Sequence, residues 1–361
     1  MVSAVRDPTA DQVPQTELPF ARLKAFLDTE FGRGALTIER VGGGQSNPTF
    51  FVDHGSRSMV LRKKPAGPIL PGAHAVEREY RVLKSLESTD VAVPRTILLS
   101  EDADVIGTPF YLMERVEGRV FHECALSDAA PGERKDLYFA MADAMARLHA
   151  VRPDRIGLAD YGKPGNYFER QIARWSRQYE ESPSARIPAL DRLIPWLRDN
   201  QPADDGHVSI AHGDFRIGNM LFHPTRPEVV AILDWELSTL GHPLADLGFA
   251  CMPWHTAPDE YGGILGLDRG PLCLPEQAEF VARYYAEAVP TATLTAFHVA
   301  FALFRFAVIF VGIADRATAG NAASTDAGQV GPLAARFALR AEAVLDAGPR
   351  DVQFAALGGR P

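Results

Sequence analysis

The stretch that most constrains this chain of 361 residues is VSIAHGDFRIGNMLFHPTRPEVVAILDWELSTLGHPLAD, residues 208–246. Two short apolar runs flank a proline-containing turn, which predicts a β-hairpin. Asn219 precedes the first run and Asp234 ends the second. Antiparallel pairing would therefore place both side chains at one end of the hairpin, beside Asp214. Two carboxylates and an amide oxygen meeting there would suit a divalent cation and a hydroxyl group to be deprotonated.

The other interpretation of this stretch is a buried hairpin with polar turn residues and an unrelated Asp. A single short motif would not decide between the two interpretations. This motif spans several constrained positions, however, so we favour the site over the plain hairpin.

The composition of the chain argues against several classes of binding partner. Hydrophobic residues make up 46% of the chain and charged residues 23%, as in ordinary soluble globular proteins, and the length allows two domains. The net charge of −9 argues against nucleic acid or an anionic membrane surface as the main partner. Three cysteines without a CxxC pair indicate neither a disulfide framework nor a zinc site and suit a reducing compartment.

No segment indicates insertion into a membrane. The first residues are polar and lack an apolar signal core. The longest apolar stretch, 296–314, contains His298 and Arg305 and therefore predicts a core helix. We expect a cytoplasmic protein without a membrane partner, and nothing in the sequence indicates its oligomeric state.

The N-terminal third predicts a small antiparallel sheet with one main helix. Apolar spacing predicts helices over 20–31 and 72–87. Runs of β-prone residues predict five strands, at 36–41, 49–53, 58–62, 97–100 and 110–113.

The turn between the first two strands is GGGQSN, residues 42–47. Glycine lets backbone N–H groups approach phosphate oxygens without obstruction. The candidate phosphate-binding residues are Gly43, Gly44, Ser46 and Asn47. Glycine-rich hairpin turns are common, and this one is not a Walker A loop, because no Gly-Lys-Ser/Thr follows it.

The rest of the chain is mainly helical in pattern. Residues 133–149 carry an apolar stripe at helical spacing, which indicates core packing. Residues 166–200 predict two further helices, broken around Ser182-Pro183 and Ile187-Pro188, and helices continue through 275–347.

The order HGDFRIGN followed by ILDWE matches the H-x-D-x-x-x-x-N and metal-binding Asp of kinase-like enzymes. It resembles the aminoglycoside phosphotransferase family more than the protein kinases, since Gly213 replaces the usual Arg and Trp235-Glu236 follow Asp234. The similarity runs from about Leu36 to Leu345. Within the family, the chain resembles the subgroup that includes kinase-like domains found beside acyl-CoA dehydrogenases. The segments that carry this resemblance are GGGQSNPTF, YGKPGNYFERQ and DWELSTLGHPLADL.

This resemblance implies an α+β, bilobal protein-kinase-like fold. It has an N-lobe built on a small antiparallel β-sheet with one main helix, and a larger, mainly helical C-lobe. We expect a flexible arm over 1–19, the nucleotide-binding N-lobe over 20–113, a connector over 114–118 and the C-lobe over 119–361.

The resemblance also implies roles for individual residues. Asp214 would be the catalytic residue, and Asn219 and Asp234 would hold Mg²⁺. Ser46, Asn47 and Arg62 would cradle the phosphates, with Glu79 fixing Arg62. Structural support would come from His212, which packs beside the loop, and from Asp246, which braces it.

Other implied contacts concern the adenine and the acceptor. Backbone groups of Glu114 and Val116, in the connector, would hold the adenine. Helices inserted before residue 208 would wall the acceptor pocket, although core aromatics and helix surface are an equal interpretation of the same residues. The candidates are Tyr167, Arg170, Arg174, Trp175 and Tyr179.

The sequence departs from the family pattern at two positions. Arg62 stands where a Lys is usual, with Lys63 beside it, and strand alternation lets only one of them face the nucleotide. We favour Arg62. His242 often has Asp as its counterpart, and the sequence assigns it no role. Arg305 is expected to brace the fold, the alternative being contact with an anionic acceptor.

The function implied is transfer of the γ-phosphoryl group of ATP to a hydroxyl of a small molecule, with Mg²⁺ as cofactor and GTP not excluded. A hydroxyacyl thioester, an amino alcohol and a sugar are all open as acceptors. The alternative is a catalytically silent nucleotide-binding pseudokinase or scaffold, which the Arg at position 62 favours. A protein kinase is disfavoured, because no Ala-Pro-Glu ends an activation loop after Asp234.

Overall fold

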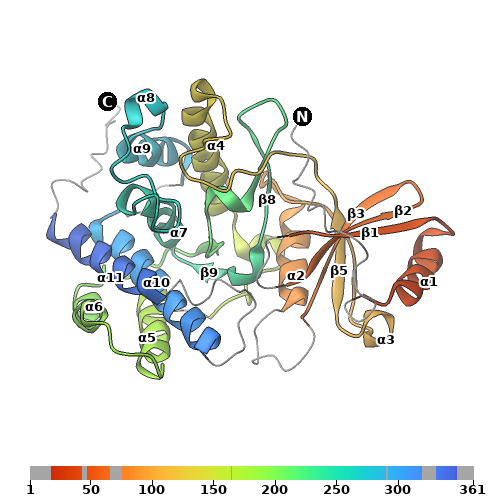
Figure 1. Ribbon diagram of the computed structural model, residues 1–361, viewed down its shortest axis with the longest axis horizontal. Helices are drawn as coiled ribbons and strands as arrows, with labels where there is room; N and C mark the ends of the chain where they lie inside the picture. Colours follow the sequence, from red (N-terminus) through yellow and green to blue (C-terminus); the bar gives the residue numbers. More distant parts are fainter. Residues whose placement is uncertain are drawn as a thin grey trace. The chain divides into compact units, whose positions relative to one another are not determined.

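The computed structural model describes residues 18–42, 47–65, 75–163, 165–289, 292–318 and 331–347 (Figure 1). The chain forms two compact units. The first comprises residues 1–119 and 230–236, and the second comprises 120–229 and 237–361. Apart from Leu18 and Pro19, the predicted arm lies outside the described residues, as do the turn residues Gly43, Gly44 and Ser46.

One segment joins a different unit from the one we expected. Residues 230–236 group with the first unit, as does Arg119, although we placed 119–361 in the C-lobe. The backbone N–H of Ile232 donates to the carbonyl of Ala92 at 2.8 Å, which ties this segment to the first unit.

The first unit is built on a five-stranded antiparallel sheet of order β1-β2-β3-β5-β4. Its strands are β1 (Leu36–Arg40), β2 (Thr49–His54), β3 (Arg57–Lys63), β4 (Thr96–Ser100) and β5 (Phe110–Glu114). Its helices are α1 (Phe20–Phe31), α2 (Val76–Leu86) and the short α3 (Ala103–Ile106). Each of the five predicted strands is present, and so are both predicted helices; α3 was not predicted.

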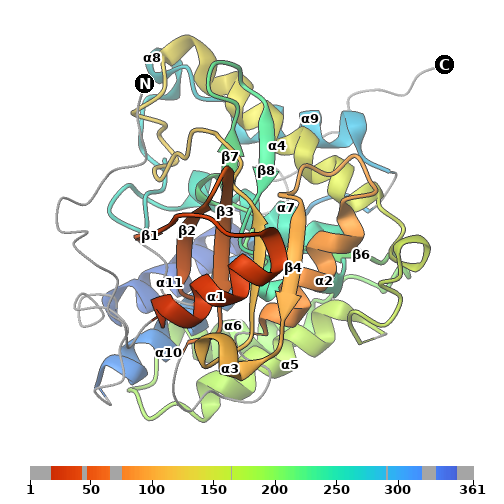
Figure 2. The same cartoon turned by 90° about the vertical axis from the view of Figure 1, so that its right-hand side faces the viewer.

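Alternation explains the packing of this sheet. In β2 every second side chain is buried, including Phe50 and Val52, as expected for a strand with one face on a core. The core cluster also takes Leu23 and Leu27 from α1, which lies across the sheet in Figure 2. In α2, Val76, Glu79, Leu83 and Leu86 repeat at helical spacing and are buried, and the helix contacts β4 and β5.

The second unit is mainly helical. Its long helices are α4 (Pro131–Ala150), α5 (Tyr167–Glu180), α6 (Pro188–Asp199), α7 (Pro243–Ala250), α9 (Gln277–Glu287), α10 (Ala296–Thr318) and α11 (Gly331–Asp346). Its short elements are η1 (Pro153–Ile156), η2 (Ile217–Asn219), η4 (Met252–His255) and α8 (Arg269–Leu272), while η3 (Trp235–Leu237) crosses the unit boundary. The mixed fold with a small antiparallel sheet and a larger helical part confirms the predicted fold class.

Four short strands, in two pairs, set the position of the candidate loop. β6 (Ser209–Ala211) and β9 (Thr239–Gly241) pair antiparallel, with Ser209 opposite Gly241 and Ala211 opposite Thr239. The loop that begins at His212 therefore continues from the Thr239 end of this two-stranded ladder. β7 (Met220–Phe222) follows the loop and pairs with β8 (Val229–Ile232).

α10 is the central helix of the second unit. It packs against α5, α6, α7 and α11, and it runs beside α11 in Figure 1. By length and composition it could cross a membrane, yet 78% of its most apolar window is buried within the protein. The prediction of a core helix over 296–314 is therefore confirmed.

The crossing of α7 and α10 depends on a glycine. A Cβ at Gly248 would lie 2.5 Å from the carbonyl oxygen of His298, which is backbone and cannot move aside cheaply. We predict that Gly248→Ala lowers the free energy of unfolding by about 1–3 kcal/mol through overpacking, measured by urea denaturation. Gly132→Ala is the control, because Gly132 is exposed in the first turn of α4 and a Cβ there would meet no described atom within 4 Å; it should keep or raise stability. Equal unfolding free energies for the two variants would contradict this account.

Candidate functional site

The hairpin predicted over 220–233 is present as β7 and β8. Its turn is closed by the backbone N–H of His223, which donates to the carbonyl of Glu228 at 2.8 Å. Asn219 immediately precedes β7, and Asp234 lies just beyond β8, in the order that the sequence indicates. Asn219 belongs to the second unit and Asp234 to the first, so that each is described with its own neighbours. That they meet at a common cation stays a prediction.

A buried carboxylate holds the start of the candidate loop. Asp246, in α7, is fully buried, and its two oxygens accept the backbone N–H groups of His212 at 2.6 Å and Gly213 at 2.9 Å. Gly213 has φ +85°, and a Cβ there would lie 2.8 Å from the carbonyl oxygen of Leu237. Glycine at 213, in place of the Arg of protein kinases, is thus required by both backbone conformation and space. The brace predicted for Asp246 is present as a contact.

A histidine and a tyrosine complete this anchor. Nε2 of His149, in α4, lies 3.3 Å from the Asp246 carboxylate, and Nδ1 of His149 lies 2.9 Å from the hydroxyl of Tyr284. Burial alone would raise the pKa of Asp246. The hydrogen bond and charge of His149, with the donated backbone N–H of Gly213, hold that pKa below its usual value instead. The carboxylate is therefore kept ionised as an acceptor.

The carbonyl of Gly213 is held as firmly as its N–H. Arg305, in α10, is 5% exposed and donates from Nη2 to this carbonyl. The guanidinium carbon lies 5.8 Å from the ring centroid of Trp175 and 5.7 Å from that of Phe249. Arg305 is thus the brace that we expected. Sequence reasoning could identify it only because an Arg is unusual within an apolar helix.

On this loop, Asp214 and Asn219 lie in direct contact. The amide Nδ2 of Asn219 donates to the Asp214 carboxylate at 2.7 Å and to its backbone carbonyl at 2.9 Å. Nε of Arg216 lies 3.3 Å from the same carboxylate, a partner that the motif did not indicate. His212 is fully buried, and its Nδ1 accepts the N–H of Asp214 at 3.2 Å, which fits the packing role expected of it.

In the first unit, Arg62 bridges two carboxylates. Its Nε lies 2.8 Å from Oε2 of Glu79, and its Nη2 lies 2.6 Å from Oδ1 of Asp234. The predicted ion pair between Arg62 and Glu79 is present, whereas the contact with Asp234 was not predicted. Lys63 is 3% exposed and follows Arg62 on the strand, where alternation turns it away. Arg62 is therefore the residue of the pair that faces Glu79.

Glu79 is the buried centre of this group. It is 1% exposed and accepts hydrogen bonds from Asn47 Nδ2 at 2.5 Å and from the Tyr111 hydroxyl at 3.0 Å. Burial raises the pKa of Glu79, and the guanidinium of Arg62 opposes that rise. Burial disfavours the charge on Arg62, yet the carboxylates of Glu79 and Asp234 raise its pKa.

Asn47 has a contact that the sequence did not indicate. Its side chain is 3% exposed, and its Nδ2 donates to the buried carboxylate of Glu79 at 2.5 Å. The phosphate contact expected of Asn47 is therefore left to its backbone and stays a prediction, while its side chain positions Glu79. Tyr111 does the same and was missed, although the strand register places it directly opposite Arg62.

Asp234 has a strained backbone. Its φ of +66° lies in the left-handed region, which few residues other than glycine adopt. Such strain is concentrated at functional sites, where surrounding structure holds it in place. Asp234 ends the hairpin at the predicted position, and the Arg62 guanidinium shows that its carboxylate already attracts a cation.

Glu114 and Val116, the connector residues expected to hold the adenine, differ in their surroundings. The backbone N–H of Glu114 donates to the carbonyl of Arg95 at 2.8 Å, so it is already used within the first unit. An adenine contact at Glu114 would therefore have to use its backbone carbonyl or its side chain. Val116 lies beyond β5, outside regular secondary structure.

The candidates for the acceptor wall divide into two groups. Tyr167 and Arg170 line a cavity of about 630 Å³ in the second unit. Trp175 and Tyr179 are buried core side chains, with Trp175 donating to Gln171 and the Tyr179 hydroxyl lying against Ile187. Arg174 lies over the ring of Trp175, its guanidinium carbon 5.1 Å from the centroid. For these last three, core and surface packing is the interpretation that fits.

His242, which the sequence left without a role, caps a helix. Its Nδ1 accepts the backbone N–H of Leu244 at the start of α7, at 3.2 Å. Its Nε2 lies 3.3 Å from the carboxylate of Asp205. An Asp at this position could provide the same cap, because short side chains with an acceptor oxygen suit helix N-termini.

With this geometry described, comparison with known proteins decides the family. The profile of the phosphotransferase enzyme family (APH) matches residues 37–292. The chain belongs to this family. The chain resembles a crystallised protein of Ralstonia eutropha JMP134, named as a candidate aminoglycoside phosphotransferase. The two are 43% identical, with a TM-score of 0.81 and coverage of 91% of this chain and 98% of the other.

Other relatives show both the subgroup and the fold. The chain is 39% identical over 325 residues to mouse acyl-CoA dehydrogenase family member 10, and 42% identical over 299 residues to chicken family member 11. These matches cover 89% and 81% of this chain, but only 30% and 38% of the two relatives. A ternary complex of aminoglycoside phosphotransferase APH(4)-Ia with AMP-PNP and hygromycin B shares the fold, at 16% identity and a TM-score of 0.57 over 90% of this chain and 98% of that one. The family and subgroup inferred from the motifs are confirmed.

The Glu79 group yields a stability prediction. Glu79→Gln keeps the side-chain shape but removes the charge that matches Arg62. We expect a loss of about 1–3 kcal/mol in the free energy of unfolding, since it leaves a buried cation poorly compensated. The control is Glu77→Gln on the same helix, where the carboxylate is 28% exposed and pairs with Lys64. Urea denaturation of both variants checks this, and similar losses would contradict the central position of Glu79.

A second prediction concerns the loop anchor. Asp246→Asn replaces one acceptor oxygen by an NH₂ group that faces a backbone N–H. We predict a loss of about 1–3 kcal/mol in unfolding free energy, together with faster hydrogen exchange at His212 and Gly213, measured by mass spectrometry. Asp154→Asn, whose side chain is 49% exposed, should change stability by less than about 0.5 kcal/mol. Unchanged exchange at the loop in Asp246→Asn would overturn the anchor.

Proposed function

We propose that this phosphotransferase moves the γ-phosphoryl group of ATP to a hydroxyl group of a small molecule, with Mg²⁺ as cofactor. The observation that carries the proposal is the contact of Asp214 with Asn219 at 2.7 Å, on a loop whose backbone is anchored at Gly213 from both sides. Positioning of this kind is the main requirement for phosphoryl transfer, because the protein supplies little covalent chemistry.

Asp214 would orient the acceptor and receive its proton. The acceptor oxygen forms a bond to the γ-phosphorus while the bond from that phosphorus to the β–γ bridging oxygen breaks and ADP leaves. The hydroxyl proton passes to the Asp214 carboxylate. A strong base is not needed, because a loose transition state builds little charge on the nucleophile before the new bond forms. Arg216, 3.3 Å from the same carboxylate, would help to fix its orientation.

The oxygen ligands fit magnesium. Mg²⁺ is commonly bound through one or two carboxylates together with phosphate oxygens and water. Asp234 offers a carboxylate that already pairs with a cation, and Asn219 offers an amide oxygen. When bound, the ion would neutralise charge on the β- and γ-phosphates. Arg62, fixed by Glu79 at 2.8 Å, would bind the phosphates from the first unit.

The acceptor is proposed only as a class. The chain spans well under half of the dehydrogenase relatives, so their activities do not transfer to it. Hygromycin B is bound by APH(4)-Ia, and a macrolide 2′-phosphotransferase, MphH of Brachybacterium faecium, shares the fold at 17% identity with a TM-score of 0.56 and coverage of 86% of this chain and 97% of that one. A hydroxylated small molecule is the shared feature, and hydroxyacyl thioesters, amino alcohols and sugars are the acceptors to screen.

The second candidate function is a silent nucleotide-binding protein. It is favoured by Arg62 at the usual Lys position, with its guanidinium 2.6 Å from the carboxylate assigned to the metal. Retention of Asp214, Asn219 and Asp234 together favours the enzyme. We also propose a cytoplasmic location and no nucleic-acid or membrane partner, supported by the acidic net charge of −9 and by three cysteines that are all free thiols.

The test is phosphate transfer from γ-labelled ATP to a panel of hydroxylated metabolites and acyl thioesters. We predict Mg²⁺-dependent product, lost on EDTA addition, and a fall in kcat of about 10²–10⁴-fold in Asp214→Asn. Asp234→Ala should abolish metal-dependent turnover while the protein stays folded by circular dichroism.

The matched control is Asp199→Asn, an exposed carboxylate at the end of α6, which should keep wild-type kcat. ATP binding by wild type without transfer to any acceptor or to water would establish the silent alternative. Retained turnover in Asp234→Ala would refute the metal assignment.

A further inference from the structure

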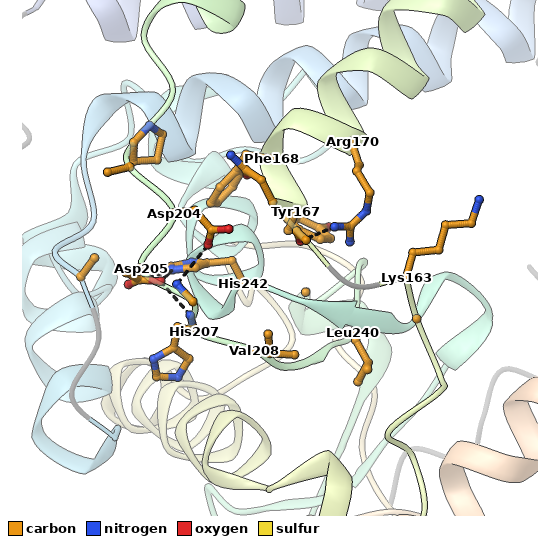
Figure 3. Close-up of a pocket in the computed structure, with 18 of the residues that line it drawn as sticks. Lys163, Tyr167, Phe168, Arg170, Asp204, Asp205, His207, Val208, Leu240 and His242 are labelled. Atoms are coloured by element: carbon orange, nitrogen blue, oxygen red, sulfur yellow. Dashed lines mark hydrogen bonds and ion pairs between the residues drawn. The ribbon is translucent and has the colours of Figure 1, made fainter.

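The cavity of about 630 Å³ in the second unit is lined by the acceptor-wall candidates Tyr167 and Arg170, but neither Asp214 nor Asn219 lines it (Figure 3). It lies at the Gly241 end of the β6–β9 ladder, whereas the loop with Asp214 continues from the Thr239 end. The start of α5 forms one side, with Tyr167, Phe168 and Arg170, and Lys163 precedes it. The segment 202–208 forms the other side, with Asp204, Asp205 and His207.

A buried histidine in the cavity wall has one nitrogen without a partner. His298, near the start of α10, is 2% exposed. Its Nδ1 accepts the backbone N–H of Thr295 at 3.0 Å. Among the described residues, none forms a hydrogen bond with its Nε2. Buried polar atoms are rarely left unsatisfied, and each such atom calls for an explanation.

The state of this ring follows from its contacts. Because Nδ1 accepts a backbone N–H, the proton of the neutral ring must be on Nε2, which makes Nε2 a donor. Burial and the neighbouring His242 lower the pKa of His298 to about 3, so the ring is neutral near pH 7. His298, which is one of the residues that line the cavity, therefore carries a single N–H donor in a desolvated position.

Aromatic rings hold this donor in place. The ring of Phe168 lies 5.3 Å from the rings of both His298 and His242. Those two histidine rings stack at 6.4 Å with an angle of 22° between their planes. His242 is already used at both nitrogens, by Leu244 and by Asp205. Of the two stacked histidines, His298 is therefore the one whose ring N–H has no acceptor among the described residues.

The charges around the cavity indicate where a ligand would lie. Asp204 accepts the N–H of Gly206, and Asp205 accepts the N–H of His207 and contacts His242, so both carboxylates already have donors. Two cations, Lys163 and Arg170, and a third carboxylate, Asp160, also line the cavity, as does the N-terminus of the 14-residue helix α5. Arg170 donates to the carbonyl of Gly165. A helix N-terminus and cations favour a negatively charged oxygen.

We propose that this cavity binds a small organic acid, through a carboxylate or phosphate oxygen that accepts the Nε2–H of His298, at a site separate from the phosphotransfer centre. The apolar part of such a ligand would lie against Phe168, Val208 and Leu240, which also line the cavity. The proposal does not depend on the function proposed above.

Two substitutions separate the donor from the helix cap. Asn at 298 can accept the Thr295 N–H as Nδ1 does, but it offers no group at the position of Nε2. Gln at 298 places an amide N–H near the position of Nε2 but loses the cap. His298→Asn should therefore keep the fold and lose the ligand, whereas His298→Gln should be less stable and still bind.

The probes are benzoate, phenyl phosphate and the neutral benzyl alcohol, titrated into the full chain by calorimetry and by ligand-observed NMR. We expect millimolar binding of at least one of the two acids, tighter than that of benzyl alcohol. His298→Asn should weaken it by about tenfold or more, as for loss of a hydrogen bond to a charged group, and His298→Gln should restore it. The preferred acid distinguishes a carboxylate ligand from a phosphate ligand.

Three outcomes would overturn the proposal. They are no saturable binding of either acid, equal binding of benzyl alcohol, and unchanged binding in a folded His298→Asn variant. Asp214→Asn tests whether the site is separate. It should leave acid binding unchanged even where it abolishes phosphate transfer, and loss of acid binding in that variant would refute a separate site.

Discussion

The contact on which the second unit depends most is the one between the Asp246 carboxylate and two consecutive backbone N–H groups, at His212 and Gly213. A fully buried carboxylate is costly unless donors surround it, and here two N–H groups and the ring of His149 do so. Arg305 then secures the carbonyl of the same glycine. The loop therefore has one defined conformation, and this conformation fixes the positions of Asp214 and Asn219 relative to each other.

The first unit also contains a buried carboxylate, Glu79, but a different set of donors satisfies it. Glu79 is buried and is satisfied by Asn47, Tyr111 and Arg62, which come from the turn after β1, from β5 and from β3. The guanidinium that neutralises Glu79 also reaches Asp234. In both units, therefore, one inward carboxylate collects donors from several elements and orients a group that faces outward. Such networks specify a single arrangement, because partial satisfaction would be expensive.

Much of this could be predicted from the sequence, because the main signals are local. The five strands and the hairpin before Asp234 follow from alternation and turn residues, and the pair of Arg62 with Glu79 is implied by the resemblance to the family. The contacts of Asn47 and Tyr111 with Glu79 could not be predicted. They depend on which way a turn amide points and on cross-strand register. The grouping of 230–236 with the first unit, the left-handed conformation of Asp234 and the His298 nitrogen that lacks a partner among the described residues are likewise tertiary effects, without a pattern in the sequence.

The central claim is that Asp234 and Asn219 share a divalent ion with the nucleotide, while Arg62 stays on Glu79. The most direct measurement is a crystal structure with AMP-PNP and Mn²⁺, in which anomalous scattering locates the metal. The account predicts a manganese peak within bonding distance of the Asp234 carboxylate and the Asn219 amide oxygen, with the Arg62 guanidinium moved from Asp234 to the phosphates. A metal bound elsewhere, or Arg62 still paired with Asp234 in the presence of nucleotide, would contradict it.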